Sequence, residues 1–173
     1  MSTRKREPTD RVWSTRNKEL CLGRTGSLAL VVGGRHWTDE AWREYCDLYS
    51  QMVVHQGPAQ AVFNLSPVYG PTSAQRKLLF DEYYRAHGIE HIRRFVLLTE
   101  SPIVRGIVTA LSWFARGDQK TRAEPPARAT EALAWVRAEA AFETAEAVEK
   151  FAVMIDVVGQ GRDLLPQDFW ALG

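Results

Sequence analysis

Short apolar runs typical of β-strands alternate along the chain with longer segments that have helical periodicity. Two of these runs, residues 28–32 and 95–98, are continuously apolar, which is typical of strands covered on both faces. The segments between the runs carry apolar residues three and four positions apart, the spacing of a helix with one buried face. Strands that alternate with helices are joined by crossover connections, which place successive strands parallel. The pattern therefore predicts an α/β protein with a mixed, mainly parallel sheet and helices packed against it.

The predicted elements follow one another in a regular order. Residues 19–34 read as two strands joined by a turn at 23–26, which makes an antiparallel hairpin. A helix is expected to begin after the N-cap Thr38 and to end at Gly57. The later elements are a strand at 59–65, a helix at 73–87, a strand at 93–99, a helix at 101–116, a polar edge strand within 117–126, and helices at 127–140 and 145–158.

Composition and charge divide the chain into three regions. Its 173 residues, 45% of them apolar and 25% charged, fit one soluble domain with extensions. Residues 1–17 are predicted to be a flexible basic N-terminal tail, 18–140 an α/β domain, and 141–173 a C-terminal helix followed by an apolar tail. The net charge of +1 gives no general attraction to nucleic acid, so no nucleic-acid partner is expected. The sequence shows no membrane span and no signal peptide, and a cytoplasmic location is expected.

Residue patterns typical of catalysis are scarce. The four histidines, at 36, 55, 87 and 91, follow different elements and form no ligand cluster, so no metal site is expected. The chain contains no glycine-rich phosphate loop, dinucleotide fingerprint or nucleophile elbow. Cys21 and Cys46 have neither disulfide-framework nor metal-site spacing. We therefore predict no catalytic residues and no cofactor, and expect a protein that is not an enzyme.

A loop rich in proline and glycine precedes the second predicted helix. Thr72 and Gln75 have the spacing of a capping box, in which Thr72 caps the helix and Gln75 reaches back to its backbone. Ser73 then has a free hydroxyl at the positive end of the helix, where a phosphate group is favoured. Two interpretations stay open: the hydroxyl pair serves the helix, or it marks a phosphorylation and recognition site.

The order of elements, with this turn after the third strand, resembles the STAS family and most closely its SpoIIAA-like members. The resemblance rests on residues 62–79 (VFNLSPVYGPTSAQRKLL), and 130–136 (TEALAWV) are like the terminal helix of those proteins. It implies a mixed sheet of four or five strands with helices against one face. In the anti-sigma-factor antagonists of the family, a partner kinase phosphorylates a serine in a D-S-[ST]-G-like motif. Thr72 and Ser73 stand where the acidic residue and the serine of that motif would be, and Ala74 and Gln75 follow where a glycine is expected.

The combined hypothesis is a non-enzymatic signalling or adaptor module that binds a protein partner, either a kinase or a regulatory protein. The expected switch residues are Ser73 and Thr72, and the expected partner-binding residues are Tyr69, Arg76, Arg35 and Trp37. Two alternatives remain: a SpoIIAA-like carrier of a small apolar ligand held between helices and sheet, and a structural subunit that self-associates as a homodimer.

The C-terminal segment is expected to dock by its apolar side chains. Val148, Phe151, Ala152 and Ile155 recur on one face of the last predicted helix. Phe169 and Trp170 are the docking residues expected in the tail. Val148, Phe151, Ile155 and these two aromatic residues should therefore be buried, within the chain or in a dimer.

Overall fold

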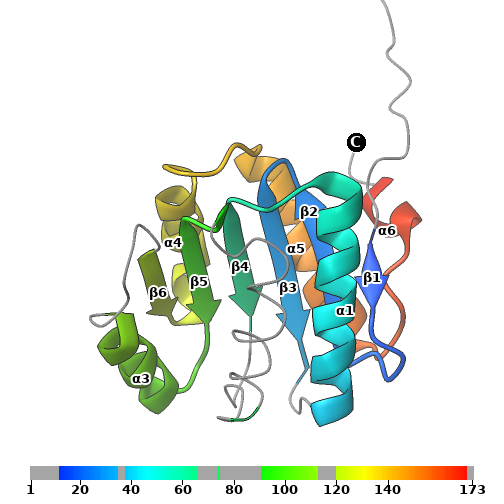
Figure 1. Cartoon of the computed structure of the whole chain (residues 1–173), viewed down its shortest axis with the longest axis horizontal. Helices are drawn as coiled ribbons and strands as arrows, with labels where there is room; N and C mark the ends of the chain where they lie inside the picture. The colour runs from blue at the N-terminus through cyan, green and yellow to red at the C-terminus, as the bar shows by residue number, and fades with distance from the viewer. Residues whose placement is uncertain (1–11, 35–37, 66–73, 75–90, 113–119, 171–173) are drawn as a thin grey trace, which may run out of the picture.

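A computed structural model describes residues 12–34, 38–65, 74, 91–112 and 120–170 (Figure 1). Within these residues a six-stranded sheet has its strands in sequence order. They are β1 (Trp13–Ser14), β2 (Leu20–Thr25), β3 (Leu28–Gly33), β4 (Ala61–Leu65), β5 (Arg94–Leu98) and β6 (Lys120–Glu124). The pairs β1–β2 and β2–β3 are antiparallel, whereas β3–β4, β4–β5 and β5–β6 are parallel. The predicted α/β class, with a mainly parallel sheet and an antiparallel edge, is confirmed.

The hairpin turn lies two residues later than predicted. Thr25 pairs with Leu28, so Gly26 and Ser27 alone form the turn and the prediction of a turn at 23–26 is wrong. Gly26 has φ of 54°, and a Cβ atom there would lie 2.1 Å from the carbonyl oxygen of Ala141. Gly23 lies within β2, and a side chain there would be crowded because the ring of Phe169 lies 3.1 Å from where its Cβ would be. A glycine inside a strand here marks close packing and not a turn.

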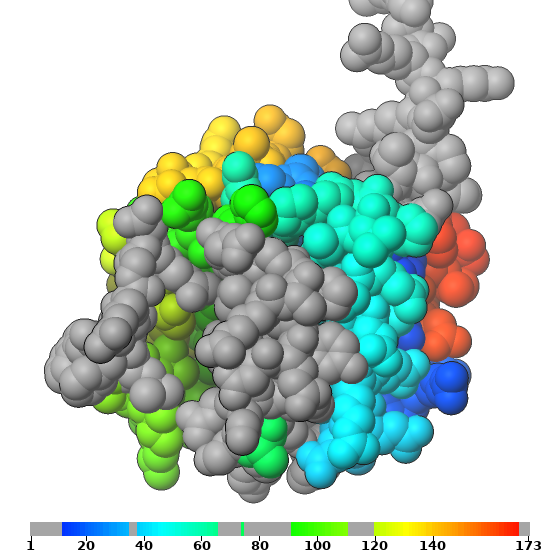
Figure 2. Space-filling model, viewed as in Figure 1, coloured from blue at the N-terminus to red at the C-terminus, as the bar shows by residue number. Residues whose placement is uncertain are grey.

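One face of the sheet is covered by α1 (Asp39–Gln56), which begins and ends where the sequence predicted. The Thr38 hydroxyl accepts a hydrogen bond from the backbone N–H of Ala41 at 3.1 Å, and Gly57 ends the helix with φ of 77°. Trp42, Tyr45 and Met52 pack on this face of the sheet. In the space-filling view α1 forms much of the surface in cyan, with α6 in red beyond it (Figure 2).

The opposite face is covered by the C-terminal helices. They are α4 (Ala129–Val136), which follows a 3₁₀ turn at Pro126–Arg128, α5 (Thr144–Gly159) and α6 (Pro166–Trp170). Figure 1 shows α1 in front of the sheet and α4 and α5 behind it. The ring of Phe151 meets that of Phe63 edge-on, with centroids 5.0 Å apart. Helices thus cover both faces, whereas the STAS resemblance implied one, and α5 is part of the main core.

Burial along α5 differs from the prediction. Phe151 is buried as expected, but Val148 and Ile155 are each 43% exposed within the chain. The buried side of the helix instead includes Lys150, which is 2% exposed. Its ammonium group lies 2.8 Å from a carboxylate oxygen of Glu146 and donates to the carbonyl of Arg24 at 3.3 Å. These two partners allow a charged side chain to lie inside the core.

The start of the described chain differs from the prediction, whereas the start of α3 agrees with it. The predicted tail at 1–17 includes β1, which pairs with β2, and Thr15, which is fully buried, so residues 13–15 are part of the folded domain. Helix α3 (Pro102–Ser112) begins as predicted, with the Ser101 hydroxyl accepting from the N–H of Val104 at 3.3 Å. Ile103 and Ile107 on this helix are 74% and 47% exposed. Among the described residues no helix combines the length and apolar character needed to cross a membrane.

Candidate functional site

An apolar groove lies between α4, α5 and the last residues of β4 and β5. Its volume is about 190 Å³. The residues that shape it are Leu65, Leu98, Leu133, Val148, Phe151 and Ile155. Among the described residues that line it, Thr130 alone has a polar side chain. The groove therefore suits an apolar group more than a charged or strongly hydrogen-bonding one.

The helical stripe predicted on α5 lines this groove. Val148 and Ile155 are two turns apart and stay partly exposed at its rim, whereas Phe151 lies between them and is 6% exposed. Phe151 is held by its edge-on contact with Phe63. The sequence periodicity thus placed these side chains correctly on one face of α5. That face lines a groove and is only partly covered. Partly exposed apolar side chains around a hollow are typical of a binding surface.

Hydrogen bonds fix the strand ends beside the groove. Thr99, which follows β5 and is 1% exposed, donates its N–H to the carbonyl of Glu124 at 3.0 Å. Arg105 on α3 donates from Nη1 to the carbonyl of Thr99 at 2.7 Å. The backbone N–H of Ser101 donates to the Thr99 hydroxyl at 3.3 Å. The ends of β5 and β6 and the start of α3 are therefore held in one arrangement.

Asn64 is a buried polar residue near the end of β4, shortly before the predicted loop. It is 6% exposed, and its Oδ1 atom has no hydrogen-bond donor among the described residues. Because side chains alternate along a strand, Asn64 shares a face with Val62, on the α1 side of the sheet. A buried oxygen without a donor is energetically unfavourable, so Asn64 marks a position where a donor would be bound favourably.

The carboxyl ends of β3, β4, β5 and β6 all lie at one edge, because these strands are parallel. In open α/β sheets, ligands usually bind outside this edge. The segments that contain the predicted site residues follow two adjacent strands, β3 and β4, in the sequence. The groove lies at this edge, and in the sequence the predicted recognition segment follows Leu65, one of the residues that line the groove.

Most of the predicted site residues lie outside the described part of the chain. These are Arg35, Trp37, Tyr69, Thr72, Ser73 and Arg76, and the roles assigned to them stay predictions. Ala74, between them, is helical and exposed. Phe169 is 5% exposed and packs in the core, as expected for a docking residue of the tail. Trp170 is the last residue of α6, and its side chain lies outside the description.

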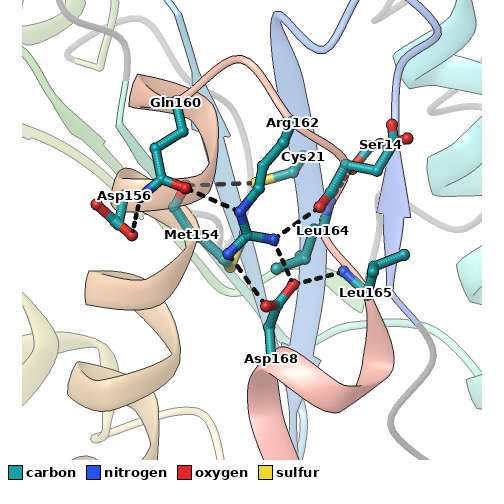
Figure 3. Close-up of polar contacts among 10 residues, drawn as sticks. Ser14, Cys21, Met154, Asp156, Gln160, Arg162, Leu164, Leu165 and Asp168 are labelled. Atoms are coloured by element: carbon teal, nitrogen blue, oxygen red, sulfur yellow. Dashed lines mark hydrogen bonds and ion pairs between the residues drawn. The ribbon is translucent and has the colours of Figure 1, made fainter.

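Polar contacts that the sequence did not predict hold α6 in place (Figure 3). Arg162 donates from Nη1 to Asp168 Oδ2 at 2.9 Å and from Nη2 to Asp168 Oδ1 at 3.1 Å. These bonds lower the pKa of Asp168. The N–H of Leu164 donates to the Ser14 hydroxyl at 2.8 Å and so joins the C-terminal segment to β1. Arg162 and Asp168 are six residues apart, a spacing with no regular periodicity that would have indicated the pair.

The described residues contain little that is typical of a catalytic centre. In the described ranges, no three His, Cys, Asp or Glu side chains lie close enough together to bind a metal ion. Burial raises the pKa of the Cys21 thiol to about 12, so the reactive thiolate is scarce at neutral pH. Cys46 is also buried. Among the described residues, the apolar groove at the carboxyl edge is a feature that could bind a ligand or a partner.

Comparison of the chain with protein-family models, curated proteins and solved structures gave no significant match.

Proposed function

We propose that the protein is a non-enzymatic signalling or adaptor module of the SpoIIAA-like type, which binds a protein partner at the carboxyl edge of the sheet. The apolar groove that opens where Leu65 ends β4 is the observation that carries this proposal. The predicted recognition segment, 69–76, begins four residues after Leu65 in the sequence. Four residues of chain span at most about 14 Å. A partner that contacts this segment is therefore within reach of the groove.

The character of the groove indicates how the partner binds. Val148 and Ile155 offer apolar surface at its rim, and the buried side chain of Phe151 lies between them. An apolar side chain from a partner would bury this surface, which stabilises a complex by roughly 25 cal/mol for each Å² removed from water. Phosphorylation of Ser73 or Thr72 would add about −1.5 to −2 charges beside the contact and so regulate it. A cytoplasmic kinase or regulatory protein is the class of partner that fits this arrangement.

The test compares matched variants against one purified partner, identified by pull-down from the native host. Val148→Asp places a charge on the groove rim, and Tyr69→Ala and Ser73→Asp alter the predicted segment. The matched control is Val54→Asp, because Val54 is 75% exposed on α1, across the sheet from α5. We expect the first three changes to weaken affinity at least about tenfold, or 1.4 kcal/mol, and the control to stay within about twofold. Equal effects for Val148→Asp and Val54→Asp would contradict a role for the groove.

The groove also supports a second candidate function, a carrier of a small apolar ligand. Its volume of about 190 Å³ is similar to that of engineered apolar cavities, about 150 Å³, that bind benzene. A ligand of that size would occupy the groove without a partner protein. Native mass spectrometry of the purified chain is expected to show the ligand as added mass, and Ala152→Phe, which fills the groove, is expected to remove it. A native mass equal to that of the bare chain would contradict this function.

A further inference from the structure

Away from the groove, at the start of β5, two arginine side chains stack on one tryptophan. The Arg94 guanidinium carbon lies 4.3 Å from the centre of the Trp135 ring, and that of Arg122 lies 4.6 Å from it. Arg94 is the first residue of β5, whereas the groove lies at the last residues of β4 and β5. Trp135 is on α4 and partly buried. This cluster is therefore separate from the groove and does not depend on the function proposed for it.

Positive charge is in excess in this cluster. Lys120 pairs directly with Arg94 across β5 and β6, and Arg122 is two residues further along β6 on the same face. Like charges on neighbouring strands repel each other. Among the described residues one carboxylate pairs with this cluster: Glu139, which lies 3.4 Å from Arg94 Nη2 and pairs with neither Lys120 nor Arg122. The next acidic residue on this face of β6, Glu124, is bound to Arg128 at 3.2 Å. The cluster thus keeps about two uncompensated positive charges.

Apart from the bond from Arg94 Nη2 to Glu139, the side-chain hydrogen-bond donors of the three cations have no acceptor among the described residues. Arg94 is 8% exposed, and its buried Nε atom has no acceptor in the part of the chain that the structure describes. Within the described ranges, neither the guanidinium of Arg122 nor the ammonium of Lys120 has a hydrogen-bond or ion-pair partner. Stacking occupies the flat face of a guanidinium and leaves its N–H groups, which lie in its plane, free to donate. Lys120 and Arg122 are both exposed, so a ligand can reach these donors from solvent.

We propose that Arg94, Lys120, Arg122 and Trp135 form a binding site for a phosphate group. A phosphate monoester carries about −1.5 to −2 charges at neutral pH, which matches the excess charge of the cluster, whereas a carboxylate would balance only half of it. Its oxygen atoms accept the paired N–H bonds that arginine donates. Trp135 holds both guanidinium groups in place, and Glu139 competes with the ligand for Arg94.

Nuclear magnetic resonance of the full chain with ¹⁵N-labelled arginine tests the proposal, because it follows the Nε–H groups directly. The probes are inorganic phosphate and a short phosphoserine peptide, each titrated at low ionic strength. We expect saturable shifts of the Arg94 and Arg122 signals. Arg122→Gln should weaken binding at least about tenfold. Its matched control is Arg43→Gln, an exposed arginine on α1, across the sheet, which should leave binding within about twofold.

A gain of binding separates this site from a structural role of the same residues. Glu139→Gln removes the competing carboxylate and should strengthen phosphate binding about threefold or more. A variant that merely unfolds cannot produce this gain. Equal affinity for both probes would show that the phosphate group itself is the ligand, and tighter binding of the peptide would indicate a phosphorylated protein. The absence of saturable shifts with both probes at millimolar concentration, or a Glu139→Gln variant without gain, would overturn the proposal.

Discussion

Arg24 joins three separate parts of the chain at the scale of a single residue. It is 8% exposed, and its guanidinium donates hydrogen bonds to the backbone carbonyls of Gly26, Gly57 and Pro58. These bonds connect the β2–β3 turn to the end of α1 and to the segment that leads into β4. Burial lowers the pKa of Arg24, since the charged form loses hydration. The carbonyl oxygens replace part of that hydration.

Replacing Arg24 should therefore destabilise the fold. Arg24→Met keeps much of the side-chain length but leaves three carbonyl oxygens without this donor, and we expect a loss of about 3 kcal/mol in the free energy of unfolding. Arg24→Lys should lose less, because an ammonium still donates to part of the set. Urea unfolding measures both changes. Arg43→Met, at an exposed position of α1, should change the value by less than about 0.5 kcal/mol. A loss from Arg24→Met that matches this control would show that the three bonds contribute little.

Cys21 makes stability depend on pH in alkaline solution. Burial raises the pKa of its thiol from 9.0 to about 12. The unfolded chain loses this proton above about pH 9, whereas the folded chain keeps it, so the free energy of unfolding falls as pH rises between these values. We expect a slope of at most about 1.4 kcal/mol per pH unit from this group. The free energy of unfolding, measured between about pH 8 and pH 11, should fall less steeply with pH for Cys21→Ala than for the parent chain. Parallel curves would contradict this assignment.

At the scale of elements, helix ends were more predictable than helix faces. Thr38 and Gly57 mark the ends of α1 in the sequence because capping and left-handed backbone are local properties. The buried side of α5 was not predictable, since Lys150 lies inside only because Glu146 and the distant carbonyl of Arg24 compensate its charge. The groove was equally hidden, because it combines residues from two strands, a 3₁₀ turn and two helices. Asn64, a polar residue in an apolar strand, lies on the α1 face of the sheet and so did not indicate the groove either.

Docking of α6 depends on the packing of one ring. Phe169 is 5% exposed and fills the space that Gly23 leaves open on β2. We expect Phe169→Ala to lower the free energy of unfolding by about 3 kcal/mol, because it creates a cavity against the sheet. Leu165→Ala is the control, since Leu165 is 41% exposed, and it should cost less than about 1 kcal/mol. Thermal or urea unfolding measures both, and equal losses would show that α6 is not held by this contact.

At the scale of the whole molecule, the boundary predicted after residue 140 divides a continuous core. Phe151, Met154 and Val157 of α5 pack with Leu30 of β3 and Phe63 of β4 in one buried cluster. Sequence periodicity identified the helix but could not show which sheet face needed it. Long-range packing of this kind is decided by the hydrophobic area left uncovered and not by local propensity.

A chain that ends at residue 140 is therefore expected not to fold. It would keep all six strands but would leave the face of β2 and β3 that α5 covers open to water. Circular dichroism and the dispersion of amide signals should show a loss of fixed tertiary structure. A chain that begins at residue 12 serves as the control, and should melt within a few degrees of the full chain. A cooperative unfolding transition in the chain that ends at residue 140 would support the predicted domain boundary.

The packing of α5 against the hairpin of β2 and β3 has a consequence for synthesis on the ribosome. Cys21 on β2 donates to the carbonyl of Met154 on α5 at 3.9 Å, a contact between residues 133 positions apart. At about 5–20 residues per second, roughly 7–27 seconds pass between the synthesis of these two residues. During that interval one apolar side of the nascent hairpin has no helix to cover it. A chaperone that shields exposed apolar strands would act on this protein in that interval, and the need for it would end when α5 leaves the exit tunnel.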